Sequence, residues 1–223
     1  MTKKIMKDIA IYGSGGFGRE VACLINLINK KSAQWNLLGF YDDLKEIGYS
    51  TEYGSVLGGI NDLNVYNQPL NVIVAIGNPN VVFDVVSKID NSNIEFPNIF
   101  ASDTIFLDKN NVTLGKGNIF CSNCLLSCNV HIGSFNAFNG LVTIGHDTNI
   151  GNFNSVMPGV RISGNVELGD RNFLGVSAIV LQKIKIGNDT TIGTNSVIMR
   201  RTKDFTTYLG NPAVEILKPN IKR

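Results

Sequence analysis

The hydrophobic residues follow different rules in the two halves of the chain. In the first half, short apolar runs alternate with stretches in which apolar residues recur at helical spacing. This pattern predicts strands at 9–12, 37–41 and 72–76 and helices at 19–29 and 81–89. Alternating strands and helices indicate a parallel sheet with helices packed on its faces, here in the order βαβαβ.

From about residue 105 the apolar positions recur every six residues. The series of large apolar residues runs without a slip through Leu114, Phe120, Leu126, Ile132, Phe138, Ile144, Ile150, Val156, Ile162, Leu168, Leu174, Val180, Ile186, Ile192 and Ile198. The next position is often glycine. The residues two positions before each large apolar residue of this series are small, polar or β-branched, as at Cys124, Asn136 and Ala178.

A period of six fits neither an α-helix nor a simple hairpin sheet, but it is typical of a parallel β-helix. Each hexapeptide forms one short side, three sides make a triangular coil, and the stacked aliphatics fill the interior. We therefore expect three parts: an α/β domain over 1–103, a β-helix over 104–201 and a tail over 202–223.

A glycine-rich loop follows the first predicted strand and precedes the first helix. Gly13-x-Gly15-x-x-Gly18 has the spacing of a dinucleotide-binding fingerprint, in which glycines allow the backbone to approach a phosphate. Asp42 and Asp43 end the second strand, where a carboxylate can accept hydrogen bonds from a ribose or a base. This predicts a nucleotide site in a Rossmann-like half-domain, because the length holds only about half of a full dinucleotide fold.

Composition and charge exclude several other classes. The net charge of +2 gives no electrostatic case for nucleic acid or an anionic membrane as partner. No apolar stretch of signal-peptide or membrane-spanning length occurs. Four cysteines are compatible with free thiols in a reducing compartment, so we expect a cytoplasmic protein.

The spacing Cys121-x-x-Cys124-x-x-x-Cys128-x-x-His131 superficially suggests a zinc site. In the six-residue frame these side chains occupy different positions and point in different directions, so they cannot converge on one ion. We expect no metal, and we expect His131, next to a core aliphatic, to be structural.

His146 and Asp147 form a different kind of pair. Histidine titrates near neutral pH and therefore suits general-base chemistry, and a neighbouring carboxylate can orient the ring or raise its basicity. The alternative is a surface histidine on a β-helix turn.

Together these motifs carry a family resemblance over nearly the whole chain. The loop at 13–18, Asp42-Asp43, Ile76-Gly77-Asn78, Gly145-His146-Asp147 and the tail Gly210-Asn211-Pro212-Ala213 resemble one branch of the hexapeptide-repeat acyltransferases. That branch contains sialic acid O-acetyltransferases and N-acetyltransferases of nucleotide-linked 4-amino sugars. The resemblance implies a left-handed β-helix, whereas the general crossover rule alone predicts the opposite hand.

The resemblance also implies an activity: transfer of an acetyl group from acetyl-CoA to an amino or hydroxyl group of a nucleotide-activated sugar. A UDP-4-amino-sugar used in bacterial surface glycans is the expected acceptor, with His146 as general base supported by Asp147. The implied acceptor contacts are Gly15, Gly16, Phe17, Asp42, Asp43 and Gly77. The implied acetyl-CoA contacts, between the subunits of a homotrimer, are Ser155, Gly175, Val176 and Thr194.

This chain departs from the family pattern at three positions. Phe17 stands where many relatives have histidine, Ser155 stands where some relatives have a second histidine, and Val214 follows Ala213 where the tail usually has a basic residue. Either Lys218, Arg200 or Arg201 then meets the 3′-phosphate of CoA, or the affinity for CoA is lower. The alternatives are O-acetylation of sialic acid or another free sugar, a nicotinamide-dependent reductase, and a non-catalytic β-helix protein that binds nucleotide sugars.

Overall fold

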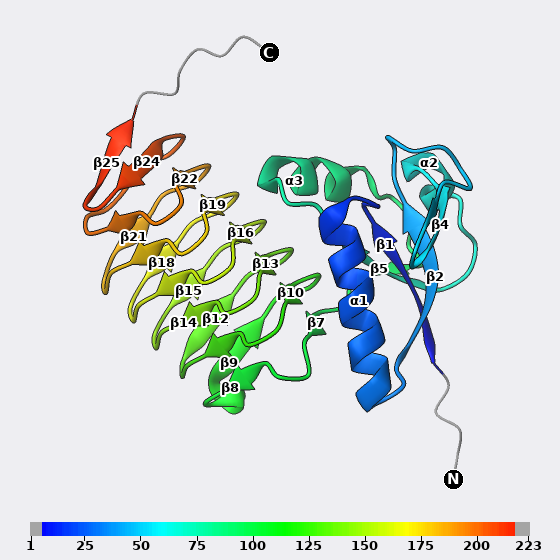
Figure 1. Cartoon of the computed structure of the whole chain (residues 1–223), viewed down its shortest axis with the longest axis horizontal. Coiled ribbons are helices and arrows are strands. Elements are labelled where there is room, and N and C mark those ends of the chain that lie inside the picture. The colour runs from blue at the N-terminus through cyan, green and yellow to red at the C-terminus, as the bar shows by residue number, and fades with distance from the viewer. Residues whose placement is uncertain (1–5, 217–223) are drawn as a thin grey trace. The chain divides into compact units, whose positions relative to one another are not determined.

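The computed structural model describes residues 6–216 and divides the chain into two compact units, Met1–Ser102 and Asp103–Arg223. The first unit is an α/β domain and the second a β-helix (Figure 1). The elements of the first unit are β1 (Lys7–Tyr12), α1 (Gly16–Lys31), β2 (Trp35–Tyr41), β3 (Ser50–Thr51), β4 (Gly54–Gly58), α2 (Ile60–Asn64), β5 (Leu70–Val74), α3 (Pro79–Lys88), β6 (Ile94–Glu95) and β7 (Ile99–Phe100).

The sheet of the first unit has the strand order β3-β4-β2-β1-β5-β6. All its pairs are parallel except β3 with β4. The three predicted strands and both predicted helices are confirmed, with shifted ends. The βαβαβ prediction is incomplete, because it misses β3, β4, α2 and β6. Strands β3 and β6 have only two residues each, and β4 begins and ends at a glycine and has only two large apolar residues, so neither kind produces a periodic signal.

The helices of this unit begin and end where their terminal residues stabilise them. In α3, Pro79 occupies the first turn and the Asn78 side chain accepts hydrogen bonds from the amides of Asn80 and Val81. Helix α1 ends at Lys30 and Lys31, whose positive charges interact favourably with the negative, C-terminal end of the helix dipole. Its buried face packs against β1 and β2.

The second unit is a left-handed β-helix with three faces of short parallel strands. Face 1 contains β10 (Ile119–Phe120), β13 (Ala137–Phe138), β16 (Ser155–Val156), β19 (Phe173–Leu174) and β22 (Thr191–Ile192). Face 2 contains β8 (Ile105–Phe106), β11 (Leu125–Leu126), β14 (Thr143–Ile144), β17 (Arg161–Ile162), β20 (Ile179–Val180) and β23 (Val197–Ile198). Face 3 contains β9 (Val112–Leu114), β12 (Val130–Ile132), β15 (Asn149–Ile150), β18 (Glu167–Leu168) and β21 (Lys185–Ile186), and a 3-10 turn, η1 (Lys109–Asn111), precedes β9.

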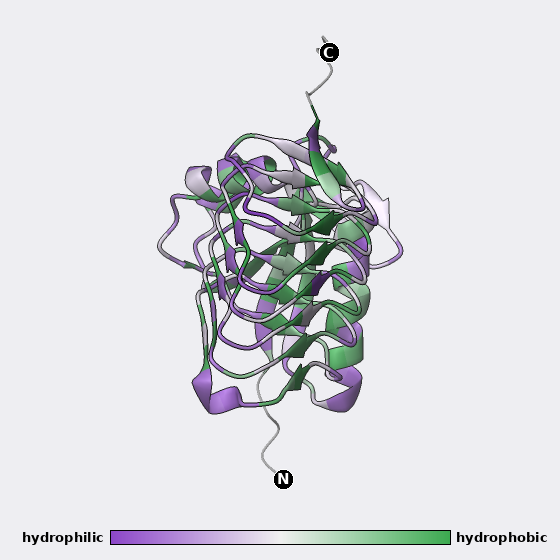
Figure 2. Cartoon of the chain, turned by 90° about the vertical axis from the view of Figure 1, so that its left-hand side faces the viewer, coloured by the Kyte–Doolittle hydropathy of each residue, from purple (hydrophilic) through white to green (hydrophobic). Residues whose placement is uncertain are grey.

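The predicted six-residue frame is confirmed as the interior of the β-helix. Fourteen of the fifteen aliphatic or aromatic frame residues are buried, and Leu114 in the first coil is half-buried. In Figure 2 many of the short strands are green, while several of the turns between them are purple. Asparagines also lie inside: the side-chain oxygens of Asn118 and Asn136 accept the backbone N–H of the asparagine 18 residues further on. The asparagine of one coil therefore satisfies a backbone N–H of the next coil at these positions.

The tail forms structure that the sequence did not predict. The last coil is shortened, because Thr191 pairs with Thr207, 16 residues later. Strand β24 (Thr207–Gly210) thereby extends face 1, and β25 (Ala213–Ile216) pairs with it in antiparallel fashion. This hairpin covers the free edge of the last coil on that face. The expected cation Lys218 lies outside the described residues.

Phe120 and Phe138 stack inside the β-helix at a centroid distance of 4.7 Å, and both are fully buried. We predict that Phe138→Ala lowers the free energy of unfolding by about 3–5 kcal/mol, because it leaves a cavity between coils. Thermal and denaturant unfolding followed by circular dichroism measures this loss. The control is Phe205→Ala on the surface, which should change stability by no more than about 0.5 kcal/mol.

Candidate functional site

The predicted nucleotide-binding residues gather at one edge of the sheet. Strand β1 lies between β2 and β5, so the loops that follow these three strands are neighbours. They carry Gly15 and Gly16, Asp42 and Asp43, and Gly77 respectively. The chain order reverses direction at β1, and open α/β sheets bind ligands at such a switch point.

The glycines of this edge divide into two kinds. A Cβ at Gly18 would collide with the carbonyl oxygen of Gly13, so these two glycines let α1 pack closely on the strand end. A Cβ at Gly15, Gly16 or Gly77 would meet nothing within 4 Å. Gly15 and Gly16 border open space at the N-terminus of α1, which has no acidic residue in its first turn, and Gly77 borders open space on the loop after β5. Phe17 is half-buried in that turn.

Asp42 and Asp43 hold the loops in place through hydrogen bonds that the sequence did not reveal. The Oδ2 atom of Asp42 accepts from the backbone N–H of Ser14 at 2.8 Å and from its hydroxyl at 2.6 Å. Burial raises the pKa of Asp42, but the hydrogen bonds from Ser14 outweigh burial and leave that pKa below its ordinary value. Asp43 accepts from the Tyr12 hydroxyl at 2.6 Å and from the amide of Ile60 at 2.8 Å.

The edge of the β-helix between faces 2 and 3 carries His146. We call this the histidine edge; its turns are Cys128-Asn129, His146-Asp147, Gly164-Asn165, Gln182-Lys183 and Arg200-Arg201. Backbone hydrogen bonds join successive turns, from Asp147 to Cys128, from Asn165 to His146 and from Lys183 to Gly164. The turns are therefore stacked one above the other.

His146 and Asp147 are in contact, as the sequence suggested. The Nδ1 atom of His146 lies 2.7 Å from Oδ2 of Asp147, and the imidazole is 47% exposed. Asp147 has a φ of 57°, a left-handed conformation that aspartate tolerates better than most residues. Its other carboxylate oxygen accepts a hydrogen bond from Asn129 at 2.7 Å. Hydrogen bonds from Asn129 and His146 hold the pKa of Asp147 below its ordinary value.

This arrangement fixes the protonation pattern of the ring. The ionised carboxylate of Asp147 accepts a hydrogen bond from Nδ1–H of His146. The neutral imidazole therefore has its free lone pair on Nε2. A Cβ at Gly164 would lie 2.5 Å from Nε2, so the ring rests directly above the bare backbone of the next coil. Both Asn129 and Gly164 lie 18 residues from the pair, and the coil length would have identified them from the sequence.

The four residues expected to contact acetyl-CoA lie at a different place on the β-helix. Val176 and Thr194 are exposed on the edge between faces 1 and 2, which we call the valine edge; its turns are Gly140-Leu141, Pro158-Gly159, Val176-Ser177 and Thr194-Asn195. Gly175 precedes Val176 and is buried. Ser155 lies within face 1 and is 2% exposed. Face 2 separates these residues from the His146 side chain of the same chain.

The cysteines and His131 do not come together. The Cys124 thiol is buried, donates to the carbonyls of Phe138 and Asn139, and has its pKa raised to about 12 by burial. His131 lies on face 3 beside the Thr113 hydroxyl at 2.6 Å. Within residues 6–216 there is no group of three or more His, Cys, Asp or Glu side chains that could hold a metal. Nor is any helix of that part of the chain long and apolar enough to cross a membrane.

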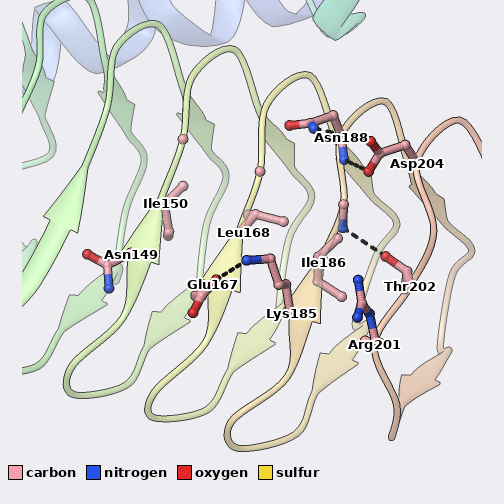
Figure 3. A pocket seen from close by; sticks show the side chains of 13 residues that line it. Asn149, Ile150, Glu167, Leu168, Lys185, Ile186, Asn188, Arg201, Thr202 and Asp204 are labelled. Carbon is pink, nitrogen blue, oxygen red and sulfur yellow. Dashed lines mark hydrogen bonds and ion pairs between the residues drawn. The ribbon is translucent and has the colours of Figure 1, made fainter.

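An open cavity of about 600 Å³ lies on face 3 (Figure 3). Its lining includes Lys185 and Glu167, which form an ion pair at 2.6 Å, and Arg201 from the histidine edge. Asn188 and Thr202 add further polar groups. No pattern in the sequence indicated this cavity, because its residues come from four successive coils.

Comparison with known proteins confirms the resemblance drawn from the motifs. Residues 8–89 match the family model described as the PglD N-terminal domain. Among curated protein sequences, none matches the chain.

Solved structures match almost the whole chain. WeeI from Acinetobacter baumannii AYE has a TM-score of 0.84 and 26% identity, covering 95% of this chain and 100% of its own. The acetyltransferase domain of PglB from Neisseria gonorrhoeae FA1090 has a TM-score of 0.84 and 23% identity, covering 94% of this chain and 100% of its own. PerB from Caulobacter crescentus, solved in complex with CoA and GDP-perosamine, has a TM-score of 0.73 and 21% identity, covering 95% and 98%. The chain has the fold of these proteins.

Proposed function

We propose that this protein transfers an acetyl group from acetyl-CoA to an amino group of a nucleotide-activated sugar. A UDP-4-amino-sugar of bacterial surface glycan biosynthesis is the acceptor class that we favour. The observation that carries the proposal is the His146–Asp147 pair, with an exposed imidazole whose Nδ1 is held by a carboxylate. The shared fold supports it, since one relative is named an acetyltransferase domain and PerB was solved with CoA and a nucleotide sugar.

In the proposed reaction His146 acts as general base. Nε2 of His146 removes a proton from the neutral amine of the sugar while the amine nitrogen attacks the carbonyl carbon of the thioester. The carbon–sulfur bond then breaks, the acetyl group remains on the sugar nitrogen as an amide, and the CoA thiolate takes up the proton from the His146 imidazolium. Asp147 stabilises the imidazolium that forms, because its carboxylate is already ionised and bonded to Nδ1.

The α/β unit is the proposed acceptor site. The open space before Gly15, Gly16 and Gly77 suits phosphates, which the amides at the start of α1 can bind. A carboxylate offers about four acceptor positions, and Asp43 uses two of them within the protein. Asp42 and Asp43 therefore retain capacity for donors on a ribose or a base. Phe17 borders this space and is the proposed apolar contact.

The acetyl-CoA site is proposed to need two copies of the chain, because Val176 and Thr194 lie on the valine edge and His146 on the histidine edge. Face 2 lies between these edges and has several apolar side chains on its outer surface, beside the exposed Arg161: Ile105, Leu107, Leu125, Ile179, Leu181 and Met199. Turning face 2 toward a three-fold axis hides this surface and places the histidine edge of one copy against the valine edge of the next.

We predict that the protein is a homotrimer and that Leu181→Lys shifts it toward monomers, because it places a charge in the hidden face. Light scattering coupled to size exclusion measures the mass. Asn149→Lys on polar face 3 is the matched control and should leave the trimer intact. A monomeric wild-type protein would contradict the shared-site model.

The nature of the product separates the proposed N-acetylation from O-acetylation. Mass spectrometry of the sugar product before and after treatment with hydroxylamine is suitable, because this nucleophile cleaves esters but leaves amides. A stable acetyl group on a 4-amino sugar supports the proposal. A labile acetyl group on sialic acid or another sugar would replace it with an O-acetyltransferase.

A further inference from the structure

The histidine edge carries a row of cations beyond His146. In chain order its turns contribute His146, then Gly164, then Lys183, then Arg200 and Arg201. Lys183, Arg200 and Arg201 are exposed, and none of them forms an ion pair with a carboxylate among residues 6–216. Three positive charges thus lie on the same edge as the proposed base, on the C-terminal side of it.

The stacking of the coils fixes how far these cations lie from the base. Parallel strands lie about 5 Å apart, so Lys183 is about 10 Å and Arg200 about 15 Å from His146 along the β-helix axis. Between the thioester sulfur and the first phosphorus of CoA there are about thirteen bonds, which span about 15 Å when extended. Arg200 therefore lies at the height of the first phosphorus of an extended CoA, and Lys183 lies one coil nearer to the base.

The valine edge has residues at the intermediate heights. In copies related by an axis parallel to the β-helix, equal residue numbers lie at equal heights. Val176 and Thr194 then lie about 8 Å and about 13 Å above His146. One extended molecule can pass the base first, then Val176 and Lys183, and then Thr194 and Arg200, in order of height. Gly164, which has no side chain, leaves the path beside Nε2 open.

We propose that Lys183, Arg200 and Arg201 bind the phosphates of CoA, in place of the basic residue that Val214 replaces in the tail. This inference rests on the proposed function, because it takes CoA as the donor. Arg201 also lines the cavity on face 3, where Asn188 and Thr202 offer polar contacts to the adenosine end (Figure 3). Of the two carboxylates that line the cavity, Glu167 is paired with Lys185 at 2.6 Å, which lowers its repulsion of a phosphate, and Asp204 accepts a hydrogen bond from the backbone N–H of Asn188 at 2.8 Å.

Binding of CoA to the intact protein, measured by isothermal titration calorimetry, tests the inference. We expect Lys183→Ala and Arg201→Ala each to weaken CoA binding roughly five- to tenfold, with a larger loss in the double variant. Lys109→Ala, at the opposite end of the β-helix, is the matched control and should bind as wild type. Turnover of acetyl-pantetheine, which lacks the phosphates, should be unchanged in both edge variants.

Three results would overturn the assignment. The edge variants could bind CoA as wild type does, they could lose acetyl-pantetheine turnover to the same extent as acetyl-CoA turnover, or Lys218→Ala alone could remove the affinity. A wild-type protein that binds no CoA would instead overturn the donor in the proposed function, and the cation row with it. The two failures are therefore distinguishable.

Discussion

Replacing His146 by alanine is expected to lower kcat/KM for acetyl transfer by about 10²–10⁴-fold, the usual contribution of a general base. The loss should appear in kcat, because the side chain acts on the proton of the attacking amine and not on the binding of either substrate. Steady-state kinetics with a saturating nucleotide sugar separates the two constants. His131→Ala is the matched control, since it removes the only other histidine, which lies on face 3.

The same variant has a pH signature. In wild type the rate should fall as the pH decreases through the range in which histidine gains a proton, because imidazolium cannot act as a base. The pKa of Asp147 lies below its ordinary value, so that carboxylate stays ionised over this range and does not produce the fall. The amine of the acceptor also protonates, so an acid limb unchanged in His146→Ala would assign it to the substrate and count against His146 as base.

Gly164→Ala is expected to reduce the rate almost as strongly, although residue 164 makes no proposed contact with either substrate. The new Cβ would lie 2.5 Å from Nε2 of His146 and 2.7 Å from Cε1, so the ring must move. A displacement of about 1 Å in a catalytic group can lower the rate about 10²-fold. Kinetics together with the NMR signals of the His146 ring measures both the loss and its cause.

Gly140→Ala is the matched control for this prediction. It also lies in a turn of the β-helix, but its Cβ would meet only the carbonyl oxygen of Ser122 at 3.4 Å, an ordinary contact. Its rate and thermal midpoint should remain near wild type. Full activity in Gly164→Ala, with an unmoved His146 signal, would contradict the position that we assign to the ring.

The parts of the fold that repeat were the parts that the sequence predicted well. The six-residue frame identified the buried interior from Phe120 to Ile198, because the same inward position recurs in every coil. Beyond Ile198 the frame fails: the last coil is shortened and the β24–β25 hairpin follows it. Strands β3 and β6 have only two residues each, too few for a periodic pattern, so the sequence missed them.

The candidate site was predicted as residues but not as an arrangement. The sequence indicated His146 with Asp147 because the two are adjacent. Asn129 and Gly164 lie 18 residues from the pair, so the coil length would have placed them beside it, but it does not show that Asn129 donates to Asp147 or that the ring rests against the backbone of Gly164. Asp42 and Asp43 were expected to face a ligand, and they also hold Ser14 and Tyr12. Such contacts depend on how loops from different strands meet, which local patterns do not encode.

The most direct test of the central claim is release of the CoA thiol from acetyl-CoA with a panel of acceptors, for wild type and His146→Ala. The panel contains UDP- and dTDP-4-amino sugars, GDP-perosamine and free sialic acid. We predict rapid thiol release with one nucleotide-linked amino sugar, and its near-complete loss in the variant. Tight binding of a nucleotide sugar without thiol release from any acceptor would contradict the account and indicate a binding protein or a different acyl donor.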